Sequence, residues 1–140
     1  MTAREYLERL RTIDREISAM LDHKQEMLEQ AISIKSMPDG MCVQTSTSSR
    51  VEAAAIKLAD YGDEINSSVD RLVDSKREAE KLIKQVQDSR FRSILTYRYL
   101  YNWGWEKIMG QMHFESSHMF RLHGYALLEF EEIISEVRVN

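Results

Sequence analysis

The sequence has little that breaks helices or crosslinks a chain: its 140 residues include one cysteine, one proline and five glycines. The single cysteine, Cys42, excludes an intrachain disulfide and any zinc site built from several cysteines. Helix formers such as Glu, Lys, Leu, Met and Ala occur throughout, and strand-like alternation of β-branched residues is absent. We therefore expect an all-α protein, and the chain length suits one domain or two small ones.

Long apolar runs are missing as well. No uninterrupted apolar segment approaches the roughly 20 residues of a membrane span. The N-terminal MTAREYLERL carries charges where a secretory signal would be apolar. These absences predict a cytoplasmic protein without a membrane partner.

The motifs of catalysis are absent too, including a Gly-rich phosphate loop, HExxH and a nucleophile elbow. His113, His118 and His123 are spaced five apart. This spacing turns successive side chains by about 140° on a helix, so they do not share a metal-binding face. We expect no enzyme, no cofactor and no metal.

Two long segments place apolar residues at alternating steps of four and three, which is the spacing of a coiled-coil seam. The first covers residues 6–34 and the second covers residues 51–86. Helices of this length measure on the order of 50 to 60 Å. A Pro-Asp-Gly turn lies in the loop between them, at about 36–49. We predict that residues 1–88 form a long antiparallel coiled-coil α-hairpin.

Three seam positions hold residues that suit a seam poorly, namely Lys24, Lys76 and Gly62. The lysine stems can pack while their ammonium groups reach water, or the lysines can fix the register or the oligomeric state. Gly62 permits either a close helix approach or a kink. The sequence leaves these alternatives open.

Further leucines flank the first seam and widen its apolar stripe beyond what a two-helix contact needs. The widened stripe predicts a partner surface, which could be the C-terminal part of the chain folding back, a second copy of the chain, or both. We expect a homodimer. The flanking residues are Leu7, Leu21 and Leu28.

Aromatic residues change the composition after residue 88, since ten of the twelve lie between Phe91 and Phe130. We place a module boundary there and expect a second domain at 89–140. Asp88 or Ser89 can cap a helix that runs to about Tyr101, followed by a turn at 102–104. Aromatics in such a module more often form core than platforms for bases; they include Trp103, Trp105, Phe114 and Phe120.

The stretch WEKIMGQMHFESSHMFRLHG, residues 105–124, is typical of a helix-turn-helix. Ile108 and Met112 lie four apart on a first helix that begins near Trp105. A second helix begins at Ser116 or Ser117 and continues well past Gly124, because one apolar stripe persists to Val137. We expect residues 105–124 to form two helical segments that carry inward apolar stripes and are joined by a polar junction.

Net charge is −4, yet its distribution favours the same stretch. Residues 1–88 hold 13 Lys or Arg against 17 Asp or Glu, whereas residues 90–123 hold five against two. Residues 124–140 hold one against four. The only basic stretch therefore coincides with the suspected DNA-reading module, although its charge is modest.

Helical periodicity places Ser117, Arg121 and Gly124 on the outward side of the second helix, with His118 at its flank. Arg121 could reach guanine O6 and N7 or a phosphate, and a hydroxyl such as that of Ser117 could donate to either. A solvated face of a three-helix bundle is the alternative interpretation. The candidate DNA-binding residues are Ser116, Ser117, His118, Arg121, His123, Gly124, Lys107 and Arg98.

The run ILTYRYLYNWGWEKIMGQMHFESSHMFRLHGYAL, residues 94–127, resembles the sigma-70 region 4-like helix-turn-helix of small phage-encoded regulators related to the RinA and ArpU types. The resemblance implies a DNA-binding module and a role in phage or prophage transcription in a bacterial host cell. The preceding long helices are similar to the N-terminal part of that family. The matching residues are Leu95, Arg98, Tyr99, Trp105, Glu106, Ile108, Met112, Phe114, Phe120, Arg121, Leu122, His123, Gly124, Ala126 and Leu127.

The sequence departs from the family pattern at Met109, His113 and Glu115. Met109 replaces a small residue and would widen the spacing of the two helices. His113 must accept a turn conformation that is easier for Gly. Glu115 brings negative charge toward DNA where a capping Ser is expected, and Ser116 could take over the cap.

We therefore expect a transcriptional regulator that binds double-stranded DNA as a homodimer held by the helical hairpin, with RNA polymerase as a possible second partner. One alternative is an adaptor that contacts RNA polymerase or another regulator without reading DNA. Another is a small terminase subunit for DNA packaging, which would assemble into a ring of many copies.

Overall fold

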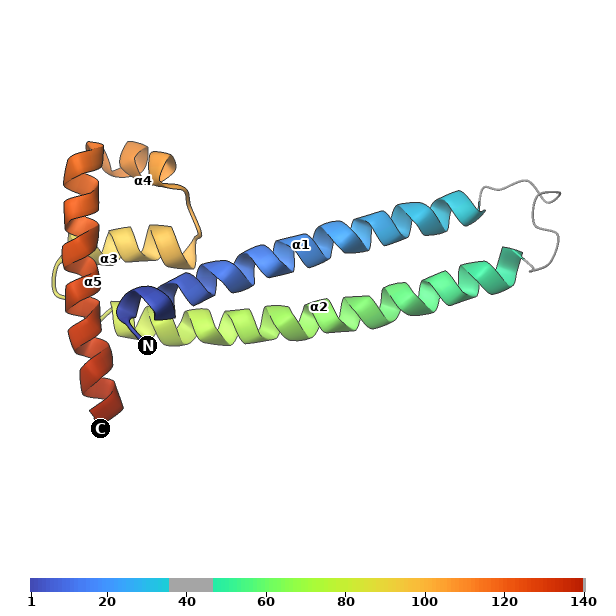
Figure 1. Ribbon diagram of the computed structural model, residues 1–140, viewed down its shortest axis with the longest axis horizontal. Coiled ribbons are helices and arrows are strands. Elements are labelled where there is room, and N and C mark those ends of the chain that lie inside the picture. Colours follow the sequence, from blue (N-terminus) through green and yellow to red (C-terminus); the bar gives the residue numbers. More distant parts are fainter. Residues whose placement is uncertain (36–46, 140) are drawn as a thin grey trace. The chain divides into compact units, whose positions relative to one another are not determined.

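The computed structural model describes residues 1–35 and 47–139, and no strand occurs in that part of the chain. The all-α prediction is therefore confirmed, while the predicted Pro-Asp-Gly turn and Cys42 lie outside the described residues. None of the described helices is long and apolar enough to cross a membrane. The elements, coloured along the sequence in Figure 1, are α1 (Ala3–Lys35), α2 (Thr47–Ile83), α3 (Ser89–Leu95), the π-helical segment η1 (Thr96–Leu100), α4 (Trp105–Met112) and α5 (Ser116–Val139).

Contacts between residues divide the chain into two compact units. One unit contains residues 1–14 and 72–140, and the other contains residues 15–71. The first unit thus joins the start of α1 and the end of α2 to all the later helices. The predicted division at residue 88 is based on the change in aromatic composition, whereas these two units are defined by contacts between residues.

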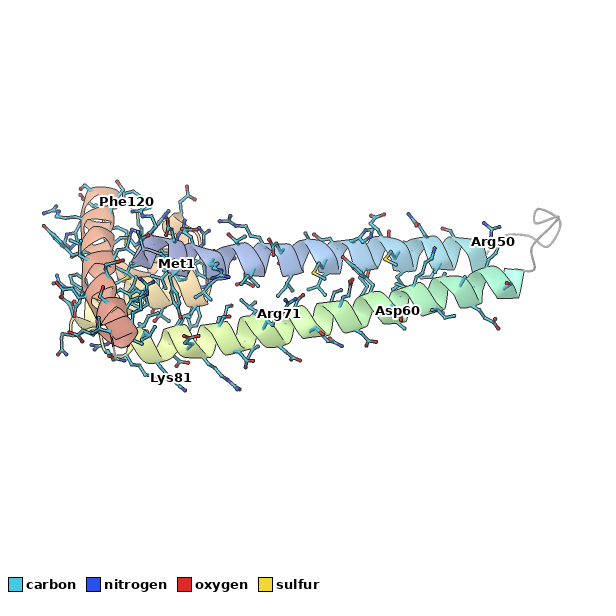
Figure 2. The ribbon with its side chains drawn as sticks, turned by 60° about the horizontal axis from the view of Figure 1, so that its bottom comes forward. Met1, Arg50, Asp60, Arg71, Lys81 and Phe120 are labelled. Carbon is cyan, nitrogen blue, oxygen red and sulfur yellow. The ribbon has the colours of Figure 1, made fainter. Side chains whose placement is uncertain are left out.

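In the unit 15–71, α1 and α2 run antiparallel, as Figure 1 shows. The rings of His23 and Tyr61 meet edge to face with centroids 5.2 Å apart. A Cβ added at Gly62 would lie 3.4 Å from Nζ of Lys24. Gly62 therefore permits a close approach of the lysine side chain, and α2 continues through it without a break. Exposed charged residues such as Asp60 extend outward from α2 (Figure 2).

The larger core lies in the other unit and brings together residues distant in sequence. Leu7 and Leu10 of α1 pack in one cluster with Ala79 and Ile83 of α2 and with Phe130 of α5. Burying a Leu, Ile or Phe side chain contributes about 1.5 to 3 kcal/mol. α2 begins at Thr47, inside the predicted loop, and ends at Ile83, three residues before the end of the predicted seam. Val86, which lies beyond the end of α2, is still buried.

Lys76 forms an ion pair with Asp14, with 3.0 Å between Nζ and the carboxylate. This pair links α1 to α2 inside the first unit and shows that the seam lysine does more than reach water.

Carboxylates on α5 hold the ends of other elements. The backbone N–H of Ala3 donates to Glu131 in the first turn of α1. The backbone N–H of Gln87 donates to Glu129 at 2.7 Å. A carboxylate at a helix N-terminus satisfies an otherwise unpaired N–H and opposes the helix dipole favourably. The acidic C-terminal part of α5 is thus partly used in fixing the fold.

α3 is capped as predicted, because the Asp88 carboxylate accepts a hydrogen bond from the Arg90 backbone N–H at 2.8 Å. The helix continues through η1 to Tyr101, whose N–H donates to the carbonyl of Thr96 five residues back. The sequence did not predict this π turn. A π turn contains one residue more than an α turn and changes which side chains face inward. Here Tyr99 is buried, whereas Tyr101 is 57% exposed.

Candidate nucleic-acid interface

A second core cluster fastens α3, α4 and α5 to one another. Ile94, Ile108, Met119 and Leu122 are its buried members. The predicted inward stripes of residues 105–124 therefore meet in one small core. Partly buried residues that surround it are Phe91, Tyr97, Trp103, Trp105, Met109, Met112 and Phe114.

His113 makes the turn between α4 and α5 in the left-handed region, with φ of 58° and ψ of 41°. This confirms the prediction that His113 adopts a conformation easier for Gly. Its N–H and that of Phe114 both donate to the carbonyl of Met109, which closes the end of α4. The next helix begins at Ser116, and the Glu115 carbonyl accepts its first bond, from Met119. Glu115 rather than Ser116 thus takes the N-cap position.

The N-terminal part of α5 presents most of the predicted DNA-binding residues on its open side. Ser116, Ser117 and Arg121 are exposed. A methyl group added at Gly124 would meet no atom within 4 Å, so that position is also open. His118 is half-buried, because its ring meets the ring of Phe114 edge to face at 4.7 Å.

Lys107 and Arg98 differ in their availability. Lys107 on α4 is exposed, with its ammonium 4.1 Å from the centroid of the Trp103 ring. Arg98 lies 4.3 Å over the ring of Trp105 and donates to the Trp103 carbonyl at 3.1 Å. The cation–π contact and the hydrogen bond to the carbonyl together hold the segment before α4 in place. Arg98 therefore supports the surface more than it forms it.

His123 is not part of this surface, which corrects the sequence-based interpretation. It is 6% exposed, and its Nε2 lies 2.7 Å from Oη of Tyr99. Burial, with smaller contributions from Arg4 and Arg98, lowers the pKa of His123 to about 4. Burial likewise raises the pKa of Tyr99 to about 12. The pair is neutral at pH 7 and acts as a polar bond inside the core.

Fewer cationic side chains are available at this surface than the sequence count indicated. Arg90 pairs with Asp88 at 2.9 Å, and Arg92 donates to the carbonyls of Val86 and Gln87. Within the described part of the chain, the side chain of Arg121 has no ion pair or hydrogen bond. Arg121 and Lys107 are therefore the cations best placed to meet a phosphate or a base.

Phe120 was missed as a surface residue, because aromatics of the motif were expected in the core. It is 48% exposed, with its ring 5.2 Å from that of Trp105. The available signal was periodicity, since Phe120 lies off the stripe of Met119, Leu122 and Ala126. Further large apolar side chains of α5 are exposed as well, including Tyr125 at 52% and Leu128 at 66%.

Metal-binding groups do not gather here: residues 1–35 and 47–139 contain no cluster of three or more His, Cys, Asp or Glu suited to a metal ion. Comparison with curated proteins gives no significant match, and comparison with solved structures gives none either. A family model described as a protein of unknown function, DUF1492, matches residues 32–131, which contain all of α2, α3, η1 and α4. By this match over most of its length, the chain belongs to the DUF1492 family of proteins of unknown function.

Proposed function

We propose that this protein is a phage or prophage transcriptional regulator that binds double-stranded DNA through a helix-turn-helix made by α4 and α5. One observation carries the proposal. α5 is seated on α3 and α4 by Met119 and Leu122, while Ser117, Arg121 and Gly124 remain on its open side. A recognition helix needs this combination of a fixed inner face and polar outer residues near its N-terminus.

The exposed side chains suit contacts with both bases and phosphates. The guanidinium of Arg121 can donate two hydrogen bonds to guanine O6 and N7, which gives about 1 to 3 kcal/mol of discrimination. Ser117 can donate to a phosphate or a base edge, and Lys107 can meet a phosphate as a point charge. The lack of a side chain at Gly124 allows close approach of the helix to the groove.

Two available cations make a weak electrostatic contribution in one chain. A homodimer held by the hairpin of α1 and α2 would double it and match an operator with two half-sites. If each subunit neutralises two phosphates, the logarithm of the binding constant should fall with the logarithm of salt concentration with a slope near −3.6, taking about 0.9 per phosphate.

The test is fluorescence anisotropy on duplexes from upstream of the neighbouring genes, at several stated salt concentrations. We expect Arg121→Ala to weaken binding to the preferred duplex about 10- to 100-fold and to relax its sequence preference. Arg71→Ala, an exposed arginine on α2, is the matched control and should bind as the unchanged protein does. Absence of preference over random DNA at every salt concentration would contradict the proposal.

A second candidate function is favoured by the exposed apolar residues of α5. Phe120, Tyr125 and Leu128 are about half exposed or more, which is unusual for large side chains on a DNA-reading helix. An adaptor that binds RNA polymerase or another regulator would cover them. If Leu128→Gln abolishes capture of RNA polymerase while Arg121→Ala leaves it intact and no duplex is preferred, the adaptor function replaces DNA reading.

A further inference from the structure

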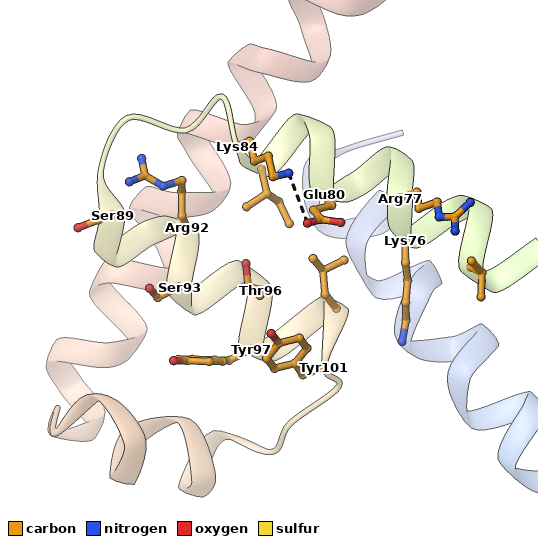
Figure 3. A pocket seen from close by; sticks show the side chains of 13 residues that line it. Lys76, Arg77, Glu80, Lys84, Ser89, Arg92, Ser93, Thr96, Tyr97 and Tyr101 are labelled. Atoms are coloured by element: carbon orange, nitrogen blue, oxygen red, sulfur yellow. Dashed lines mark ion pairs between the residues drawn. The ribbon is translucent and has the colours of Figure 1, made fainter.

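A groove of about 630 Å³ lies between the last turns of α2 and the helix formed by α3 and η1. Figure 3 shows the side chains that line it, with the Glu80–Lys84 ion pair as a dashed line. One wall consists of Val73, Lys76, Arg77, Glu80, Ile83 and Lys84. The other consists of Ser89, Arg92, Ser93, Thr96, Tyr97, Leu100 and Tyr101.

Both walls follow helical spacing, so the groove is an elongated channel between two helices. The α2 wall extends over residues 73–84, a length of about 16 Å at 1.5 Å per residue. The two helices are joined by the turn at 84–88, so the groove closes at Lys84 and Ser89 and opens between Val73 and Tyr101. A channel of three turns between two helices has the dimensions to accept a third helix.

The groove is amphipathic. Val73 is 41% exposed and Tyr101 is 57% exposed, so large apolar surface remains uncovered at the open end. Four cationic side chains line the groove against a single carboxylate, that of Glu80. Lys84 pairs with Glu80 at 3.5 Å and Lys76 with Asp14 at 3.0 Å, which leaves the groove with an excess of two positive charges.

We propose that this groove binds an acidic amphipathic helix of a partner protein, about three turns long. Leucine-like residues of the helix would cover Val73, Leu100 and Tyr101, and its flanking carboxylates would meet Arg77 and Lys84. The net positive charge of the groove and the apolar surface between its cationic side chains both suit such a helix.

The proposed site is separate from the surface proposed for DNA. Ser89, Arg92 and Ser93 line the groove, whereas Ile94 and Leu95 on the other side of α3 are buried in its two cores. The inference therefore goes beyond the proposed function and does not depend on it. A nucleic acid fits the groove less well, because its sugar-phosphate backbone would leave the apolar surface of Val73 and Tyr101 without an apolar partner.

The probe is a fluorescein-labelled 15-residue helical peptide with Leu on one face and Glu on both flanks, titrated by anisotropy against the full chain. We expect the double variant Arg77→Glu, Lys84→Glu to lower affinity at least 10-fold. Both side chains are exposed, so the helical circular dichroism should stay unchanged. The matched control Lys57→Glu, Arg71→Glu makes the same charge change on α2 in the unit 15–71 and should leave binding unaltered.

A charge-swapped peptide with Lys in place of Glu should bind the Arg77→Glu, Lys84→Glu variant more tightly than it binds the unchanged protein. Arg121→Ala should not affect either peptide, which separates this result from the DNA experiment. The proposal is overturned if the acidic peptide fails to bind the unchanged protein or binds the reversed variant equally well. It is also overturned if the Arg77→Glu, Lys84→Glu variant binds an oligonucleotide more weakly than the unchanged protein does but binds the acidic peptide as tightly.

Discussion

At the scale of single residues, His123 gives the protein a specific dependence on pH. Its pKa is about 4 in the folded state, against an ordinary 6.5 in the unfolded chain. Between these values the unfolded state binds a proton that the folded state excludes, so stability falls as pH falls from 6.5 toward 4 and is fully present above 6.5. We expect urea unfolding at pH 4.5 to show a loss of about 2 to 3 kcal/mol from this residue, relative to pH 7.

The control is His123→Gln, whose amide oxygen can still accept a hydrogen bond from Tyr99 but does not titrate. The difference in unfolding free energy between pH 7 and pH 4.5 should be smaller in this variant. His113→Asn removes an exposed histidine and suits the left-handed conformation, so it serves as the control for removing a histidine outside the core. Equal losses in all three proteins would show that His123 titrates normally.

Some residues of the candidate surface could be predicted from the sequence, and others could not. The turn conformation of His113 was expected from the resemblance, since the family pattern has Gly at this position, and the structure confirms the left-handed turn. Helical periodicity also indicates the burial of His123, which lies four residues after Met119 and three before Ala126, although this signal was not used. Its partner Tyr99 lies 24 residues earlier, so the hydrogen bond between the two side chains could not be predicted from local spacing.

At the scale of elements, the starts of α4 at Trp105 and of α5 at Ser116 were both predicted. Caps and apolar stripes act within one turn or two, so a sequence reveals them. The π turn at Thr96–Leu100 has no such signal, because Tyr97, Tyr99 and Tyr101 are spaced by two and suit no single helical face. It was missed for that reason, although the predicted end of the helix near Tyr101 is close to the observed one.

The ion pair between Asp14 and Lys76 should stabilise the contact of α1 with α2. Its side chains are 24% and 28% exposed, so water screens the pair only in part. A double-mutant cycle of Asp14→Ala and Lys76→Met, measured by urea unfolding, should give a coupling of about 1 kcal/mol.

The pair of Glu80 and Lys84 is the reference for that cycle. Its side chains are 52% and 72% exposed, and the residues lie four apart on one helix. The coupling expected there is about 0.3 to 0.5 kcal/mol. A coupling between Asp14 and Lys76 no larger than this would mean that the two long helices are held by apolar packing alone.

At the scale of the whole molecule, the exposed leucines of α1 bear on assembly. Leu21 is 50% exposed and Leu28 is 41% exposed, and they lie seven residues apart on one helical face. We expect light scattering to give twice the chain mass, and the double variant Leu21→Gln, Leu28→Gln to give the mass of one chain with unchanged helicity.

Leu128→Gln changes a leucine of α5 that is 66% exposed and serves as the control, since it should leave the dimer intact. A single-chain mass for the unchanged protein would refute dimerisation. A ring of many copies would instead favour the DNA-packaging alternative.

The contact between the first turn of α1 and α5 sets an order of events during synthesis. The backbone of Ala3 donates to Glu131, 128 residues later, and Leu7 shares a core cluster with Phe130. At roughly 5 to 20 residues per second on the ribosome, the first turn waits about 6 to 25 s for its partners to be made. The first turns of α1 are therefore made well before their partners on α5 and reach their native surroundings only afterwards, and until then their leucines are open to chaperones.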